Sequence, residues 1–251
     1  MSSELRGERN RYRATVEYDG SDYYGFQIQA DQPTIQGALE QALADTAGEA
    51  VRVAGAGRTD TGVHALGQVI GFRLAWRHSL DDLQRALNAR LPEGIVIREL
   101  APAEEGFHPR FSARSRVYRY TVLNQPLRSP LARRFAHQLA GSLDLLAMNA
   151  AAASLLGGHD FATFGNPPQG ENTVREVMRA VWTQAGNTFF FDIEANAFLR
   201  RMVRTVVSAL LLIGQGGMEA ESMAALLAAR DRSQAPPPAP ACGLCLMQVK
   251  Y

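Results

Sequence analysis

Long apolar runs are missing from this 251-residue sequence, and ALLLI at 209–213 is too short to cross a membrane. The N-terminal stretch MSSELRGERNRYR is charged and lacks the apolar core of a signal peptide. The content of 46% hydrophobic and 20% charged residues is that of an ordinary globular protein. We therefore expect a cytoplasmic protein that makes no contact with a membrane.

Cysteine is equally scarce, since only Cys242 and Cys245 occur, in the stretch CGLC. A zinc site would need a second cysteine pair, and residues three apart on a strand point to opposite faces. We therefore predict small buried cysteines rather than a redox or zinc site. The sequence also lacks a phosphate-binding P-loop, a dinucleotide-binding glycine motif and a convincing cluster of metal ligands. No metal and no cofactor are expected.

Lysine is nearly absent, because Lys250 is the only one among 26 basic residues. Genomic codon bias explains much of this preference for arginine, and the net charge of +1 alone does not suggest a nucleic-acid partner. The positions of the arginines are more informative. Residues 107–134 contain seven arginines and no acid, and Arg200, Arg201 and Arg204 form a second cluster. Guanidinium groups match phosphate oxygens and stack on bases, so both clusters suit contact with a nucleic acid.

The first half of the chain alternates between strand-like and helix-like patterns. Apolar residues recur every four positions in 34–48, and Ser79 and Asp82 have the spacing of a capping box. The predicted strands are 11–18, 50–57, 62–74 and 94–100, and the predicted helices are 34–48 and 79–91. This β-α-β-β-α-β order is that of a ferredoxin-like unit.

The second half repeats the pattern with additions, including a hairpin at Gly186 and Asn187. The predicted strands are 116–123, 174–186, 187–198 and 243–251, and the predicted helices are 142–157, 198–214 and 220–231. We predict an α+β fold of two ferredoxin-like units that share a continuous mixed or antiparallel sheet flanked by helices. Their expected bounds are 1–105 and 106–251. The aromatic signature of RNA-recognition motifs is absent, so the fold alone does not indicate a function.

The stretch GRTDTGVHA, residues 57–65, places the single acid Asp60 between Arg58 and a glycine-containing turn. Taken alone, such an acid is most often a turn residue. The tripeptide DTG also occurs in aspartic proteases, but a neighbouring arginine opposes the sharing of a proton between two carboxylates. A third interpretation is a carboxylate nucleophile held by a cation. An ordinary glycosidase needs a second catalytic carboxylate, and none stands out near Asp60 in the sequence.

The GRTDTGVHA stretch resembles the signature of the tRNA pseudouridine synthase A family, which isomerises uridine in the anticodon arm of tRNA. The resemblance covers nearly the whole chain in the family's order, through VEYDGSDYYGFQIQ, TIQGALEQAL, FHPRFSARSRVYRY, GGHDFATF, NTVREV, FLRRMVRTVV and CGLCLMQVKY. The departures from the family pattern are Phe26, Thr61, Thr205 and Ser208. None of them removes a group that the implied chemistry needs.

The resemblance implies roles for individual residues. Asp60 matches the nucleophile, and Tyr118 matches a tyrosine that stacks on the target base and takes part in proton transfer. Arg204 matches the arginine that pairs with the catalytic carboxylate. Arg58 matches an arginine that helps to hold the target nucleotide out of the stack, and we expect His64 to support the loop.

Residues outside the signature complete the prediction. Arg110, Arg114 and Arg116, from the acid-free segment, are candidate contacts to the RNA backbone. The implied partner is the anticodon arm of tRNA, and the resemblance also implies a homodimer. An RNA-binding module without catalysis remains the alternative from another class.

Overall fold

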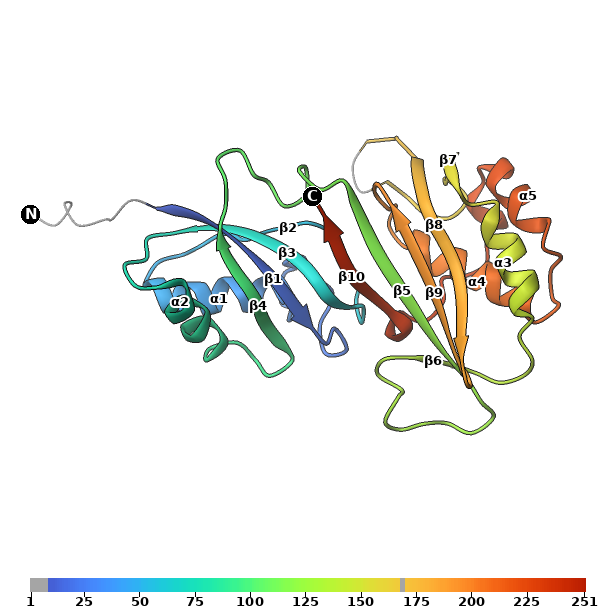
Figure 1. Ribbon diagram of the computed structural model, residues 1–251, viewed down its shortest axis with the longest axis horizontal. Helices are drawn as coiled ribbons and strands as arrows, with labels where there is room; N and C mark the ends of the chain where they lie inside the picture. The colour runs from blue at the N-terminus through green and yellow to red at the C-terminus, as the bar shows by residue number, and fades with distance from the viewer. Residues whose placement is uncertain (1–8, 168–169) are drawn as a thin grey trace, which may run out of the picture. The chain divides into compact units, whose positions relative to one another are not determined.

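The computed structural model describes residues 9–167 and 170–251, which form two compact units (Figure 1). The first unit contains the residues up to Arg114 together with Gln248–Tyr251, and the second contains Ser115–Met247. The chain therefore returns to its first unit with its last residues. The division after Arg114 compares with an expected boundary after residue 105, and we propose that the two units are the two domains.

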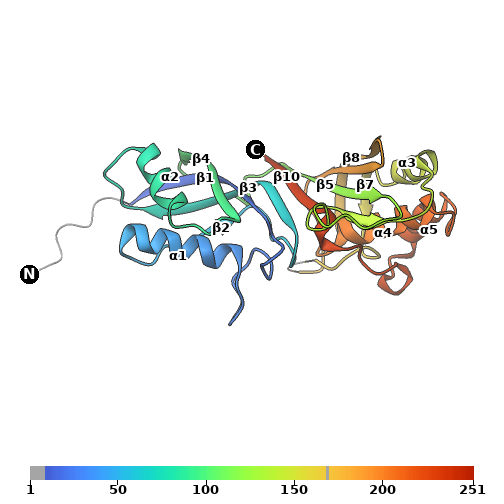
Figure 2. The same cartoon turned by 90° about the horizontal axis from the view of Figure 1, so that it is seen from below.

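The first unit has the ferredoxin-like order expected from the sequence. Its central strand pairs antiparallel with both neighbours, in the order β4-β1-β3, and the short strand β2 pairs with β3. Figure 2 shows helix α1 along one face of this sheet. The elements are β1 (Asn10–Tyr18), α1 (Ile35–Ala47), β2 (Ala54–Gly55), β3 (His64–Leu74), α2 (Leu80–Asn88) and β4 (Ile95–Pro102).

Both helices of this unit begin directly after a residue whose side chain caps the first turn. The Thr34 hydroxyl accepts a hydrogen bond from the Gly37 N–H before α1, and the Ser79 hydroxyl accepts one from the Asp82 N–H before α2. Helix α1 ends at Gly48, whose φ of 70° closes the last turn. The apolar faces of the two helices are buried in the core through Ile35, Leu39, Leu43, Leu83 and Leu87.

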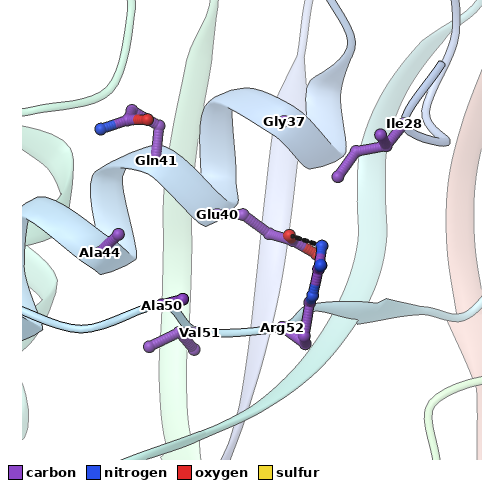
Figure 3. A pocket seen from close by; sticks show the side chains of 8 residues that line it. All are labelled: Ile28, Gly37, Glu40, Gln41, Ala44, Ala50, Val51 and Arg52. Atoms are coloured by element: carbon purple, nitrogen blue, oxygen red, sulfur yellow. Dashed lines mark hydrogen bonds and ion pairs between the residues drawn. The ribbon is translucent and has the colours of Figure 1, made fainter. Parts of the chain in front are cut away.

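The strand predicted over 50–57 is much shorter than expected, because only Ala54–Gly55 pairs with β3. Side chains of α1 occupy the backbone groups of Val53. Its N–H donates to Glu40 Oε1 over 3.0 Å, and its carbonyl accepts from Gln36 Nε2 over 3.1 Å. Arg52 completes the attachment with an ion pair to Glu40 at 2.9 Å, and both residues line a pocket beside α1 (Figure 3). Backbone groups bound in this way are not available to a sheet.

The second unit repeats the ferredoxin-like order and adds β6, β7 and α5. Its strands run in the order β10-β5-β9-β8-β7, and β6 pairs parallel with β5. A two-residue turn at Gly186 and Asn187 joins β8 to β9, as predicted. The elements are β5 (Ser115–Asn124), β6 (His137–Leu139), α3 (Leu145–Ala153), β7 (Gly157–Asp160), β8 (Val174–Ala185), β9 (Thr188–Ala195), α4 (Met202–Gly214), α5 (Ser222–Ala229) and β10 (Leu244–Lys250). The predicted α+β class, with a mixed sheet flanked by helices, is confirmed.

Helix α4 begins at Met202, four residues later than the predicted start at Phe198. The backbone of Arg200 forms a bridge with Asn166, to which its N–H donates over 2.8 Å. Arg201 then adopts a left-handed conformation with a φ of 66°. Arg200 therefore lies outside α4, although the predicted helix 198–214 included it.

The two cysteines are half-buried and form no disulfide, so the prediction that both are buried is wrong. Cys242 lies in a short 3-10 helix, Ala241–Gly243, and Cys245 lies on β10. Among the described residues, no group of histidines, cysteines and acids is arranged to hold a metal ion. Within the same residues, no helix combines the length and the apolar character that a membrane crossing requires.

Candidate active site

Asp60 lies in the loop between β2 and β3, where its side chain is half-buried. The Val63 N–H donates to the Asp60 carbonyl over 3.1 Å, and Gly62 has a φ of 77°. Asp60 therefore opens a tight turn, as the simplest interpretation of the sequence expects. The neighbouring Arg58 is exposed. The turn places a carboxylate and a guanidinium two residues apart on one short loop.

A second loop, residues 19–26, lies directly against the Asp60 loop. The Phe26 N–H donates to the Thr59 carbonyl over 3.1 Å. A Cβ atom at Gly25 would lie 2.6 Å from the Thr59 carbonyl oxygen, and one at Gly20 would lie 2.0 Å from the Val63 carbonyl oxygen. Only glycine permits both approaches. The backbone on each side of Asp60 is therefore fixed by contacts that leave little room for movement.

His64 supports this pair of loops from the start of β3. Its ring is 5% exposed, and its Nδ1 accepts a hydrogen bond from the Gly20 N–H over 3.1 Å. The same Nδ1 lies 3.2 Å from Asp19 Oδ1. Because Nδ1 accepts the hydrogen bond from the Gly20 N–H, its contact with Asp19 is a close approach rather than an ion pair. The geometry fits the expected supporting role of His64.

Tyr23 lies in the 19–26 loop, and its carbonyl accepts a hydrogen bond from the Gly62 N–H over 3.4 Å. Burial, followed by the negative charges of Asp22 and Asp19, raises the pKa of the Tyr23 hydroxyl. The phenol therefore stays protonated and neutral through the physiological range.

Tyr118 lies on β5, opposite Ile193 of β9, and is 8% exposed. Its ring packs edge-on against Phe198, with 5.1 Å between the ring centroids. Tyr120 is buried on the same face of the strand, as the alternation of the sequence predicts. The Tyr120 hydroxyl donates to the Pro240 carbonyl over 2.9 Å, and burial strongly raises its pKa.

Arg204 lies in the first turn of α4 and is half-buried. Its Nε donates to the Ala239 carbonyl over 2.7 Å, and the Ala239 N–H donates to the Arg204 carbonyl over 3.0 Å. The proline-rich stretch 235–240 is thus attached to the helix by a reciprocal pair of hydrogen bonds. The prolines of this stretch give no sequence signal that it orients the Arg204 guanidinium.

Two arginines of the acid-free segment bind groups of the protein itself. Arg116 is 8% exposed and donates from Nη1 to the Asn196 carbonyl over 2.8 Å. Arg119 makes a two-pronged ion pair with Asp192, with distances of 2.7 and 3.0 Å, and this hydrogen bonding raises its pKa. Both arginines therefore help to order the second unit, and Arg116 has little exposed surface to offer a phosphate.

The other two candidate RNA contacts lie in the first unit. Arg114 is exposed, and its backbone N–H donates to the Lys250 carbonyl over 2.8 Å. Arg110 is half-buried, with its guanidinium carbon 5.6 Å from the centre of the exposed Phe111 ring. The arrangement presents a cation and an aromatic ring side by side, which suits phosphates and bases.

The first unit therefore carries Asp60 and Arg58, whereas the second carries Tyr118 and Arg204. A half-buried carboxylate on a loop fixed by its backbone can act as a nucleophile or as a base on a molecule that reaches it. An arginine and a tyrosine supply a positive charge and a stacking surface.

Comparison with known proteins agrees with this chemistry. A family model described as tRNA pseudouridine synthase matches residues 14–112 and 151–251. The chain is 43% identical to tRNA pseudouridine synthase A of Neisseria meningitidis serogroup C (strain 053442), over 97% of this chain and 93% of the relative. It is 42% identical to the protein of that name from Citrifermentans bemidjiense, over 94% and 95%. It is 43% identical to that from Roseiflexus sp. (strain RS-1), over 94% and 88%.

These matches define an isomerase that acts on tRNA. The chain belongs to the tRNA pseudouridine synthase family.

Proposed function

We propose that this protein converts uridine to pseudouridine in the anticodon arm of tRNA and that Asp60 is the nucleophile. The observation that carries the proposal is the loop 57–65, in which a single half-buried carboxylate is fixed by close backbone contacts. Membership of the family supplies the class of reaction. The half-buried position of Asp60 on this loop supports its assignment as the group that performs the reaction.

The reaction breaks the bond between C1′ of the ribose and N1 of uracil and forms a bond between C1′ and C5. The base turns between these two steps, C5 loses its proton, and N1, which carries no proton in uridine, gains one. No electrons are gained or lost overall, so the balance needs no redox cofactor. The Asp60 carboxylate assists while the glycosidic bond is broken, and the uridine must leave the base stack to reach it.

The other signature residues have complementary roles in this proposal. Arg204 supplies the positive charge that pairs with the Asp60 carboxylate. Tyr118 stacks on the extruded base and takes part in the transfer of its proton. Arg58, which is exposed, holds the target nucleotide out of the stack.

Further contacts and an assembly state complete the proposal. Arg110 and Arg114 contact the RNA backbone, and two copies of the chain form a cytoplasmic homodimer that presents a larger surface to tRNA. Light scattering at micromolar concentration tests the dimer, and a species at the monomer mass of 27.4 kDa would refute it.

One assay separates the enzyme from an RNA-binding module without catalysis. Because C5 loses its hydrogen, a tRNA transcript with tritium at C5 of its uridines releases tritium into water when pseudouridine forms. We expect release that depends on enzyme concentration. Tight binding of the transcript without release would favour the binding module.

A further inference from the structure

A buried glutamine holds the backbone just before Asp60. Gln68 lies on β3 and is fully buried. Its Nε2 donates to the Gly57 carbonyl over 2.8 Å, and its Oε1 accepts from the Gly57 N–H over 3.3 Å. One side-chain amide therefore binds both polar backbone groups of a single residue at the start of the loop.

A tyrosine of the neighbouring strand holds the same loop closer to Asp60. The hydroxyl oxygen of Tyr18, on β1, lies 2.8 Å from Thr59 Oγ1. Gln68 Nε2 also approaches the Tyr18 oxygen at 3.5 Å, the outer limit of a hydrogen bond. Tyr18 and Thr59 are both buried. The sheet thus holds Gly57 and Thr59 through side chains that water does not reach.

We propose that Gln68 is a positioning residue that sets the direction in which Asp60 presents its carboxylate to the substrate. The inference rests on the proposed role of Asp60 as nucleophile. A primary amide is suited to this task because it donates and accepts without carrying a charge, whereas a charged group here would attract or repel the carboxylate. With both groups of Gly57 bound, the peptide planes that lead to Asp60 have one orientation.

The same device occurs elsewhere in the chain, where it only joins a helix to a strand. Asn88, at the end of α2, donates to the Ile97 carbonyl over 3.0 Å and accepts from the Ile97 N–H over 2.8 Å. Asn149 of α3 binds Trp182 of β8 in the same way, over 3.1 and 2.8 Å. These pairs hold regular structure, whereas the Gln68 pair holds a catalytic loop. Asn88 therefore provides a matched control within the same unit.

The test compares Gln68→Met with Asn88→Leu, since each change removes both hydrogen bonds and retains an apolar side chain of similar size. For each variant, the single-turnover rate of tritium release, the Kd for tRNA and the Tm are measured. We expect both variants to melt at a lower temperature and to bind tRNA normally. Only Gln68→Met should lose rate, by about 10- to 100-fold, because small displacements of a reacting group are costly.

Equal single-turnover rates for the two variants would overturn the positioning role, because a purely structural glutamine predicts that equality. If Asp60→Asn retains normal turnover, the nucleophile itself is wrong, and this result is distinct from a failure of Gln68 alone. Should Gln68→Met not fold, Tyr18→Phe tests the same attachment, since it removes the hydroxyl that binds Thr59. A normal single-turnover rate for Tyr18→Phe would then count against the proposal.

A conservative variant adds a readout that stability does not imitate. In Gln68→Glu, an ionised carboxylate accepts from the Gly57 N–H but cannot donate to the Gly57 carbonyl. A protonated carboxyl can do both. The ratio of variant to wild-type rate should therefore rise as the pH falls, and a ratio that does not depend on pH would contradict the proposal.

Discussion

Gly25→Ala tests whether the position of the Asp60 loop limits the reaction. Gly25 has a φ of 87°, and an L residue there costs about 1–2 kcal/mol of stability. The added Cβ would also lie 2.6 Å from the Thr59 carbonyl oxygen and 3.2 Å from the Asp60 carbonyl carbon. Ordinary contact begins at 3.4 Å, so the loop must move by up to 0.8 Å, the difference between 3.4 and 2.6 Å. Displacements near 1 Å lower rates by about a hundredfold.

Gly106→Ala is the matched control, because Gly106 has a φ of 84° and a Cβ there would meet no atom within 4 Å. The two variants therefore carry similar backbone strain, and only one displaces the Asp60 loop. Tritium release under single-turnover conditions should fall about a hundredfold for Gly25→Ala and stay near the wild-type rate for Gly106→Ala. Similar rates for two folded variants would refute the argument that the loop must be held in place.

Two further changes address the substrate. Tyr118→Phe retains the packing against Phe198 and should bind tRNA normally while losing most turnover, and normal tritium release would mean that the tyrosine only stacks. Replacing Arg110 and Arg114 together with Ala should reduce the slope of log affinity against log salt by roughly 0.7–0.9 for each phosphate that the protein no longer neutralises. An unchanged slope in filter-binding titrations would show that neither arginine contacts the RNA backbone.

Local sequence signals predicted both ends of α1 and the start of α2 well. Thr34 and Gly48 mark the two ends of α1, and Ser79 marks the start of α2. Each of these residues forms a hydrogen bond with a backbone group a few positions away along the chain. Such contacts depend little on the rest of the fold. The β-α-β-β-α-β order follows from the same local patterns.

Contacts between distant segments explain where the sequence misled. The helical spacing of apolar residues over 198–214 shows no break at Arg200. Pairing with Asn166 nevertheless keeps Arg200 out of α4. Val53 has strand-forming character, but Glu40 takes its N–H and leaves a strand of only two residues. Neither partner is visible from a periodic pattern, since each lies more than ten residues away in the chain.

The candidate site shows the same difference between local signals and contacts with distant residues. The signature around Asp60 is a continuous stretch, so the sequence could single out its residues. Gln68 was overlooked because its partner is the backbone of Gly57, which has no side chain to mark the contact. A polar residue in the middle of the mostly apolar strand β3 was the available signal, since such a residue must find a partner when buried.

The Asp60→Asn variant tests the central claim most directly. The amide keeps the size of the carboxylate, so the Tm and the affinity for tRNA should change little, while the charge and nearly all nucleophilicity are lost. If Asp60 is the nucleophile, tritium release should fall by roughly four orders of magnitude. A well-folded Asp60→Asn sample that binds tRNA and still forms pseudouridine at a substantial rate would contradict the account and leave Asp60 as a turn residue.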